Sequence, residues 1–144
     1  MHNEMEVRFL SLSGNEALAR AIAVSFAAQM NPGIEELSDI RTAVSEAVTN
    51  AIIHGYDQNT DRVVTLQMEI EKDVLTVIVR DEGCGIGDID LARKPFYTSK
   101  PELERSGMGF SVMEAFMDAV TVASEPQKGT TVVMQKRIVH GNGS

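Results

Sequence analysis

Residues 45–56, SEAVTNAIIHGY, form the C-terminal part of an amphipathic helix that the sequence predicts from about residue 34 to 54. Apolar side chains at i, i+3, i+4 and i+7 spacing define its buried stripe. The stripe comprises Leu37, Ile40, Val44, Ala47, Val48 and Ala51. Glu46 and Asn50 lie about 40° apart around the helix axis and roughly 110–150° from the centre of the stripe. The stretch therefore places a carboxylate and a carboxamide one turn apart, on a side that does not point into the main core.

The chain before this helix predicts a strand followed by another helix. Residues 5–12, MEVRFLSL, alternate in polarity as a strand does. A helix follows from about Asn15 to Met30, and the turn-forming residues 31–33, Asn-Pro-Gly, end it. The side chains that we expect on its buried face are Leu18, Ala21, Ile22, Ser25 and Phe26.

The chain after residue 60 predicts four more strands and one more helix. Runs rich in valine and isoleucine predict two hairpins, and a short amphipathic helix separates them. The hairpins are 62–72 with 74–82 and 119–125 with 129–139, and the helix is 108–117. This order lacks the regular alternation of a doubly wound fold. It predicts an α+β fold, a two-layer sandwich in which helices cover one face of a mostly antiparallel mixed sheet.

Length and composition indicate one soluble domain. We expect residues 1–144 to form a single unit, with a core from about 6 to 137 and a disordered tail over 140–144. No apolar run approaches the ~20 residues of a membrane span, and no signal-peptide pattern opens the chain. The single cysteine, Cys84, excludes an internal disulfide and fits the reducing cytoplasm.

The charge is acidic overall and basic in one segment. A formal net charge of −8 argues against binding of nucleic acid, which requires a basic face. Basic residues gather instead in residues 93–105, RKPFYTSKPELER. This segment belongs to a long connection, residues 82–106, that glycine and proline interrupt. Connections of this length in compact domains are usually functional loops or lids.

The Glu46–Asn50 pair suits a hard cation together with a proton transfer. Mg²⁺ needs only one or two protein oxygens when phosphates supply the other ligands, and an amide oxygen is suitable. A carboxylate one turn away could accept a proton. A solvated polar face would produce the same two residue types, so the pair alone does not define a site.

The segment RDEGCGIG, residues 80–87, combines an acid with three glycines. Asp81 ends an apolar strand, and Gly83, Gly85 and Gly87 follow it. Glycines at alternate positions let the backbone approach a flat ligand. A carboxylate at the foot of such a turn accepts from an exocyclic amine, as in adenine, but not from the O6 acceptor of guanine. A plain turn is the alternative, and the glycine spacing does not fit a Rossmann fingerprint.

The segment RSGMGF, residues 105–110, precedes the short helix. Ser106, Gly107 and Gly109 would leave backbone N–H groups exposed at the helix start, where the helix dipole also favours an anion. Arg105 could reach a terminal phosphate. An ordinary helix cap is the alternative.

The segment KGTTVV, residues 128–133, opens the last strand. The hydroxyl of Thr130 or Thr131 could bond a base, although threonine is also a common strand residue. The chain contains no Walker motif and no zinc-type spacing of Cys and His, which excludes a P-loop enzyme and a zinc site of those types.

The order of these four stretches is more specific than any one of them. EAVTNAIIHGY (46–56), DEGCGIG (81–87), GMGF (107–110) and GTT (129–131) together resemble the ATP-binding boxes of the GHKL superfamily. That superfamily includes gyrase, histidine kinases and MutL, and the resemblance covers residues 6–137. NAIIHGY and GMGFSVME in a domain of this size look most like the anti-sigma-factor serine kinases of Gram-positive bacteria. The resemblance implies the Bergerat ATP-binding fold.

The resemblance also implies a role for each candidate residue. Asn50 would coordinate Mg²⁺, and Asp81 would read the N6 amine of adenine. Glu46 would act as general base toward an attacking hydroxyl, and Arg105 would neutralise phosphate charge. The residues that would shape the base pocket are Gly83, Gly85, Gly87 and Thr130. The residues that would enclose the phosphates as part of a lid are Ser106, Gly107, Met108 and Gly109.

The resemblance implies ligands and partners as well. The ligands would be ATP or ADP with Mg²⁺. The chain would phosphorylate a serine of a STAS-type anti-anti-sigma factor and would inhibit a sigma factor that controls sporulation transcription, as a cytoplasmic homodimer without direct contact to nucleic acid or membrane. We see no phosphotransfer helix pair and no transducer domain. The alternatives are a nucleotide-gated binding switch without kinase activity and a histidine-kinase-type catalytic domain.

Overall fold

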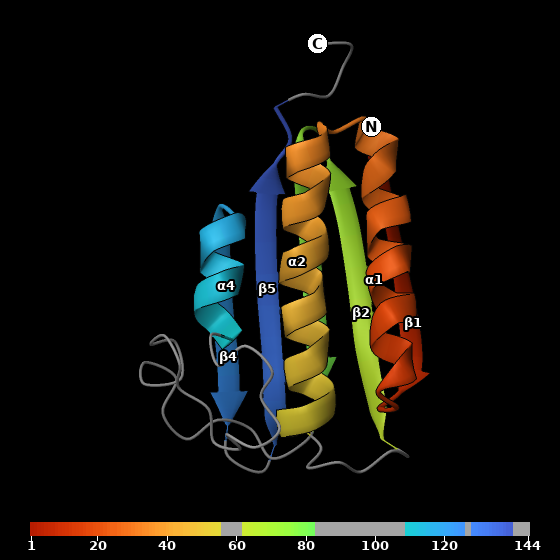
Figure 1. The fold of residues 1–144 in the computed structure, drawn as a ribbon, viewed down its shortest axis with the longest axis vertical. Helices are drawn as coiled ribbons and strands as arrows, with labels where there is room; N and C mark the ends of the chain where they lie inside the picture. Colours follow the sequence, from red (N-terminus) through yellow and green to blue (C-terminus); the bar gives the residue numbers. More distant parts are fainter. Residues whose placement is uncertain (56–61, 83–108, 126–127, 140–144) are drawn as a thin grey trace.

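The computed structural model describes residues 1–55, 62–82, 109–125 and 128–139, and these form two layers (Figure 1). One layer is a five-stranded sheet, and helices cover one of its faces. The elements in chain order are β1 (His2–Leu10), α1 (Gly14–Ala27), a 3-10 turn (Ala28–Met30), α2 (Ile34–Asn50), a π-helical segment (Ala51–Gly55), β2 (Val63–Glu71), β3 (Val74–Asp81), α4 (Gly109–Phe116), β4 (Ala119–Glu125) and β5 (Gly129–Arg137). The predicted α+β sandwich is confirmed.

The sheet has the strand order β1-β2-β3-β5-β4, and its described strands pair antiparallel throughout. Both predicted hairpins are present. The β2–β3 turn contains Lys72 with φ 57°, and β4 returns into β5 so that Glu125 lies opposite Gly129. The first strand begins at His2 and ends at Leu10, so it is displaced toward the N-terminus from the predicted range 5–12.

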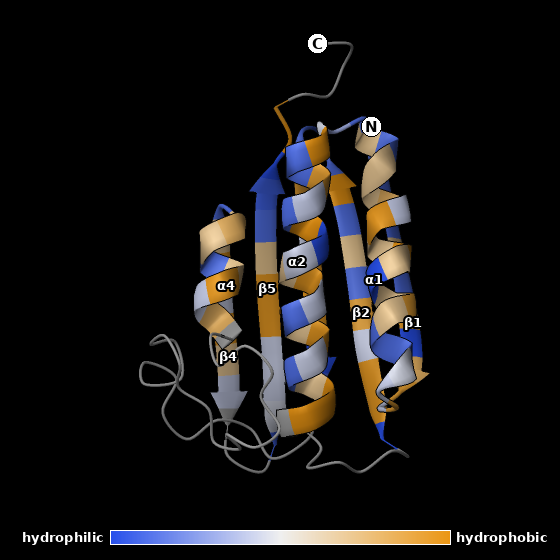
Figure 2. Cartoon of the chain, viewed as in Figure 1, coloured by the Kyte–Doolittle hydropathy of each residue, from blue (hydrophilic) through white to orange (hydrophobic). Residues whose placement is uncertain are grey.

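The core lies between the sheet and the helices. Alternate residues of β2 are buried, from Val64 to Ile70, whereas the residues between them are half-buried on the open face. Helix α2 lies in the middle of the helical layer and packs against α1, α4 and β3. Its predicted stripe is confirmed, since Ile40, Val44 and Val48 are fully buried. Figure 2 shows that the middle of β5 is apolar, that its C-terminal end is hydrophilic and that its start is near the middle of the hydropathy scale.

The predicted buried face of α1 is confirmed at Phe26 and in part at Ile22, which packs against the core, and is wrong at the other three positions. Leu18 is 57% exposed, Ala21 and Ser25 are exposed, and Ile22 is half-buried. The buried positions are Glu16, Ala19, Ala23, Phe26 and Ala27. Helix α1 packs against α2, and alanines at i, i+4 and i+8 let two helices approach closely, since a small side chain takes up little room between them. Leu18 is left on the outside, whereas Phe26 is buried.

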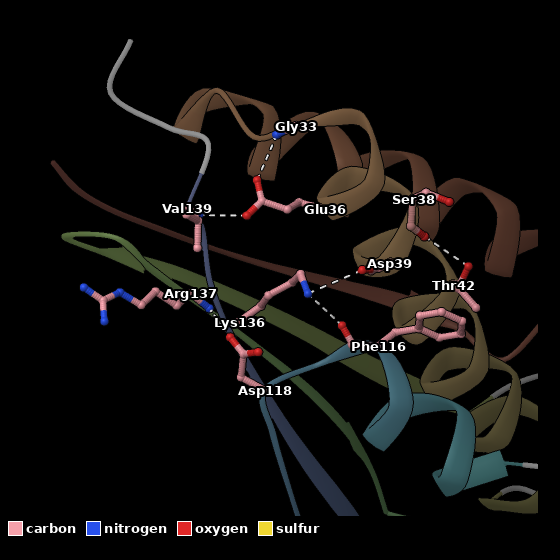
Figure 3. A network of polar contacts seen from close by, with 10 residues as sticks. All are labelled: Gly33, Glu36, Ser38, Asp39, Thr42, Phe116, Asp118, Lys136, Arg137 and Val139. Carbon is pink, nitrogen blue, oxygen red and sulfur yellow. Dashed lines mark hydrogen bonds and ion pairs between the residues drawn. The ribbon is translucent and has the colours of Figure 1, made fainter. Parts of the chain in front are cut away.

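A polar network joins α2, α4 and β5 (Figure 3). The Nζ atom of Lys136 donates to the carbonyl oxygen of Phe116 at 2.9 Å and lies 3.5 Å from Oδ2 of Asp39. Glu36 accepts from the backbone N–H of Gly33 at 2.9 Å and from that of Val139 at 2.7 Å. The network fixes both helices to the last strand, at its C-terminal part.

Some predicted segments fall outside the described residues. These are the tail 140–144 and, apart from Glu82, the predicted loop up to residue 106. Within the described ranges, no helix is long and apolar enough to cross a membrane.

Candidate active site

Four element ends that carry predicted site residues lie at the same end of the sandwich (Figure 1). Helix α2 ends there with Asn50, and β3 ends with Asp81. Strand β5 begins there with Gly129 and Thr130, and α4 begins with Gly109. The fold therefore brings together stretches of sequence that are up to 80 residues apart, from Asn50 to Thr130.

Asp81 and Thr130 are direct cross-strand neighbours on β3 and β5. They are 6% and 8% exposed, and strand alternation places both on the face that the helices cover. Thr131 lies opposite Arg80 and therefore on the other face of the sheet. Of the two threonines, the structure thus places Thr130 beside the acid.

Gly129 allows this approach of β5 to the end of β3. Its φ of +111° lies in a region that side chains disfavour. A Cβ atom at this position would overlap the backbone of Asp81 and Glu82. Glycine is therefore required here by both conformation and space.

Ser124 adds a third polar side chain that the sequence did not reveal as part of the site. It lies opposite Thr130 on β4, and its Oγ atom is 2.8 Å from Oγ1 of Thr130. Its Oγ also donates to the carbonyl oxygen of Gly129 at 3.0 Å. In the sequence, only the predicted hairpin of 119–125 with 129–139 could have indicated that residues 124 and 130 lie opposite each other.

Glu46 and Asn50 are both half-buried, as their angular distance from the apolar stripe predicts. The Oε2 atom of Glu46 is buried. The helix changes from α to π geometry directly after Asn50, and the π-helical segment packs on β3 and β5. Such π turns within helices occur frequently at functional sites. Asn50 thus stands directly before the segment that packs on β3 and β5.

A second polar contact lies one residue before Glu46. Ser45 donates to Oε2 of Glu16 at 3.0 Å, and Glu16 is buried although it is charged. The Nη1 atom of Arg20 lies 3.6 Å from the same oxygen. This contact couples α1 to the part of α2 that carries Glu46. The sequence did not predict it, because the predicted buried face of α1 did not include Glu16.

Several predicted site residues lie outside the described residues. They are Gly83, Gly85, Gly87, Arg105, Ser106, Gly107 and Met108. Helix α4 begins at Gly109, one residue after the predicted start at residue 108.

The residues in place fit a hard divalent cation. Asn50 offers an amide oxygen at the end of α2, and oxygen is the donor that Mg²⁺ prefers. Another possible set of ligands among the described residues is exposed. It comprises His2, Glu4 and Glu69, whose ligand atoms lie within 4.8 Å of one another. His2 lies opposite Glu71, next to the β2–β3 turn. This is the opposite end of the sheet from Asp81.

Comparison with known families agrees with this geometry. The family described as "Histidine kinase-like ATPase domain" matches residues 10–136, which is most of the chain. The chain therefore belongs to this family, which lies within the GHKL superfamily.

Its relatives define the family more narrowly. "Anti-sigma F factor" of Bacillus velezensis is 53% identical over 138 residues, which are 96% of this chain and 94% of the relative. "Anti-sigma F factor" of Clostridium perfringens is 54% identical and covers 96% of this chain and 99% of the relative. The protein of the same name from Geobacillus thermodenitrificans is 54% identical, with 96% and 94% covered. The chain accordingly belongs to the anti-sigma F factor family.

A solved structure supports the fold alone. The RsbU and RsbW domains of Rv1364c from Mycobacterium tuberculosis superpose with a TM-score of 0.70 at 17% identity. The match covers 94% of this chain and 32% of that chain, so this chain corresponds to about a third of the larger protein.

Proposed function

We propose that this protein is an ATP-dependent serine-protein kinase that also acts as an anti-sigma factor. It phosphorylates a serine of a small STAS-type anti-anti-sigma factor, and when free of that antagonist it binds and inhibits a sigma factor of RNA polymerase. Both activities serve the control of sporulation transcription in the cytoplasm. The names of the relatives support the sigma-factor partner, and the ATPase family supports the nucleotide.

The observation that supports the proposal is the cross-strand pair of Asp81 and Thr130, at the end of the sandwich where α2 ends with Asn50. The base would lie against the buried Asp81–Thr130 pair, where the carboxylate accepts from the exocyclic amine of adenine. The glycines at 83, 85 and 87 would form the wall of the base pocket. Residues 105–109 would enclose the phosphates, with Arg105 toward the terminal phosphate.

Asn50 is the residue that would hold Mg²⁺ through its amide oxygen. When bound, the ion neutralises phosphate charge and helps to align the transferred group. A position on the last turn of a long helix suits this task, because α2 is packed on both sides and fixes the amide.

Glu46 is the proposed general base. The serine hydroxyl of the partner attacks the γ-phosphorus, its proton passes to the carboxylate of Glu46, and the bond to the ADP oxygen breaks. Phosphoryl transfer depends mainly on positioning and charge neutralisation, so a carboxylate of ordinary basicity suffices. A nucleotide-gated switch without transfer has no need of a carboxylate beside Asn50, and Glu46 therefore distinguishes the two functions.

The test is transfer of labelled phosphate from ATP to a STAS-type antagonist. We expect acid-stable phosphoserine on the antagonist, and we expect Glu46→Gln to bind ADP normally while transfer falls by roughly 10²-fold or more. Glu35→Gln is the matched control, because Glu35 is an exposed carboxylate in the first turn of the same helix. Full transfer by Glu46→Gln would refute the role of Glu46, and acid-labile phosphohistidine would favour the histidine-kinase alternative.

We further propose that the protein is a homodimer formed through β1 and α1. Strand β1 is an edge of the sheet, and edge strands present backbone groups that another chain can pair with. Beside it, a shallow groove is lined by Met5, Ala21, Ile22, Ser25, Phe26 and Gln29. Polar positions on α1, such as the half-buried Arg20, are our candidates for contact with the sigma factor.

A further inference from the structure

Three polar side chains form a row across three neighbouring strands. Asp81 on β3 lies opposite Thr130 on β5, and Thr130 lies opposite Ser124 on β4. The next row on the same face is apolar and consists of Val79, Val132 and Val122. The polar row therefore forms the end of the helix-covered face, at the place where the proposed site reads the base.

The hydrogen bonds of Ser124 determine which way the hydroxyl of Thr130 points. Ser124 donates its proton to the carbonyl oxygen of Gly129 at 3.0 Å. A hydroxyl has one proton, so while Ser124 donates to Gly129 the 2.8 Å bond between Ser124 and Thr130 uses the proton of Thr130. Ser124 thereby accepts from Thr130, and Thr130 presents only lone pairs to its remaining surroundings.

This polarity affects what the row can bind. An ionised carboxylate is an acceptor only, so Asp81 and Thr130 together offer two acceptors side by side. An exocyclic amine carries two hydrogens and matches such a pair, either directly or through water. A ring carbonyl at the same place would bring a third acceptor and would be rejected.

We infer that Ser124 is a specificity-determining positioning residue of the nucleotide site. By taking the proton of Thr130, it keeps that hydroxyl from donating and makes the site select 6-aminopurines over 6-oxopurines. The inference rests on the proposed function, because it assumes that the base lies against Asp81 and Thr130. Without Ser124, the Thr130 hydroxyl is free to turn and donate to a 6-oxo group.

The test compares the affinities for ADP and inosine diphosphate, which carries a carbonyl at the 6-position, by titration calorimetry with Mg²⁺. We expect Ser124→Ala to lower the preference for ADP about fivefold, the size of one neutral hydrogen bond. The change should come mainly from tighter binding of inosine diphosphate, a gain that general damage to the fold does not produce. Ser124→Thr keeps a hydroxyl and should restore the preference.

Thr121→Ala is the matched control, because it removes an exposed hydroxyl from the same strand on the other face of the sheet. Circular dichroism checks folding, and Ser124→Cys, with a weak donor of similar size, carries the same expectation if the alanine variant does not fold. An unchanged preference in a folded variant would overturn the inference alone. Failure of the wild-type protein to bind ADP would overturn the proposed function as well.

Discussion

A Cβ atom placed on Gly129 would lie 2.2 Å from the carbonyl oxygen of Asp81. This distance is far inside van der Waals contact, and the atom involved belongs to the backbone, which cannot turn away. The start of β5 can therefore lie this close to the end of β3 only because residue 129 has no side chain. This close approach brings Thr130 beside Asp81.

Replacement of Gly129 by alanine tests this relationship. We expect Gly129→Ala to lower the free energy of unfolding by about 1–3 kcal/mol, because the clash adds to the strain of a positive φ. ADP affinity should fall with it, since Asp81 is displaced. Urea unfolding and calorimetry measure the two effects. Gly14→Ala is the control, because no atom lies within 4 Å of a Cβ at Gly14; equal effects of the two substitutions would contradict the account.

The carboxylate of Asp81 is the group that we propose reads the base. Asp81→Asn should weaken ADP binding by about 1.5–3 kcal/mol, roughly 10- to 150-fold, because an amide presents hydrogens where the ligand also donates. Calorimetry measures the change. Asp118→Asn, an exposed acid that accepts from the backbone N–H of Arg137, should leave ADP affinity unaltered. An Asp81→Asn protein with wild-type affinity would exclude the adenine contact.

Lys136 should stabilise the helical layer. Only 9% of this residue is exposed, and it joins the end of α4 to α2 through Phe116 and Asp39. We expect Lys136→Met to lower the free energy of unfolding by about 1–3 kcal/mol, because it leaves a carbonyl and a carboxylate without their cation. Lys72→Met, at an exposed turn, should change it by less than about 0.5 kcal/mol. Equal free energies of unfolding of the two variants in urea would refute the stabilising role of Lys136.

The ion pair of Asp73 with Arg137 should make a small part of the stability depend on pH. The hydrogen bond from Arg137, at 2.7 Å, is the main cause that lowers the pKa of Asp73 below 3.8. A lowered pKa means that the contribution is complete at pH values well above 3.8 and is lost as the pH falls through the folded-state value. The stability difference between wild type and Asp73→Asn should therefore shrink in acid. A difference that stays constant from neutral pH to about pH 2 would contradict this.

The proposed dimer depends on the edge formed by β1 and α1. Met5 is 38% exposed on that edge, and a charge there should repel a second apolar surface. We expect Met5→Glu to be monomeric by light scattering on a sizing column. Ile34→Glu is the control, since Ile34 is 90% exposed at the start of α2, and it should remain dimeric. A dimeric Met5→Glu protein would place the interface elsewhere.

Most of the fold could be predicted because apolar periodicity reports burial directly. The stripe of α2 was located correctly, and the runs rich in valine and isoleucine correspond to β2 and β3. The face of α1 was not predictable in this way. Leu18 lies outside and Ala19, Ala23 and Ala27 are buried, because close packing of α1 against α2 favours small side chains over the most hydrophobic ones.

The site was predictable in part. The resemblance assigned both Asp81 and Thr130 to the base pocket, and the structure places them side by side. Neither expected hairpin contains this pair, because it joins β3 of the first hairpin to β5 of the second. Ser124 could not be recognised, since its importance lies in the direction of two hydrogen bonds rather than in its residue type. The change to π geometry after Asn50 also leaves no simple signal in AIIHG, residues 51–55.

A crystal structure of the protein with ADP and Mg²⁺ tests the central claim most directly. We predict that the amine of adenine lies within hydrogen-bonding distance of the carboxylate of Asp81, with Thr130 beside it and the amide oxygen of Asn50 next to the metal and the phosphates. Adenine bound away from the Asp81–Thr130 pair, or Asn50 remote from the phosphates, would contradict the account.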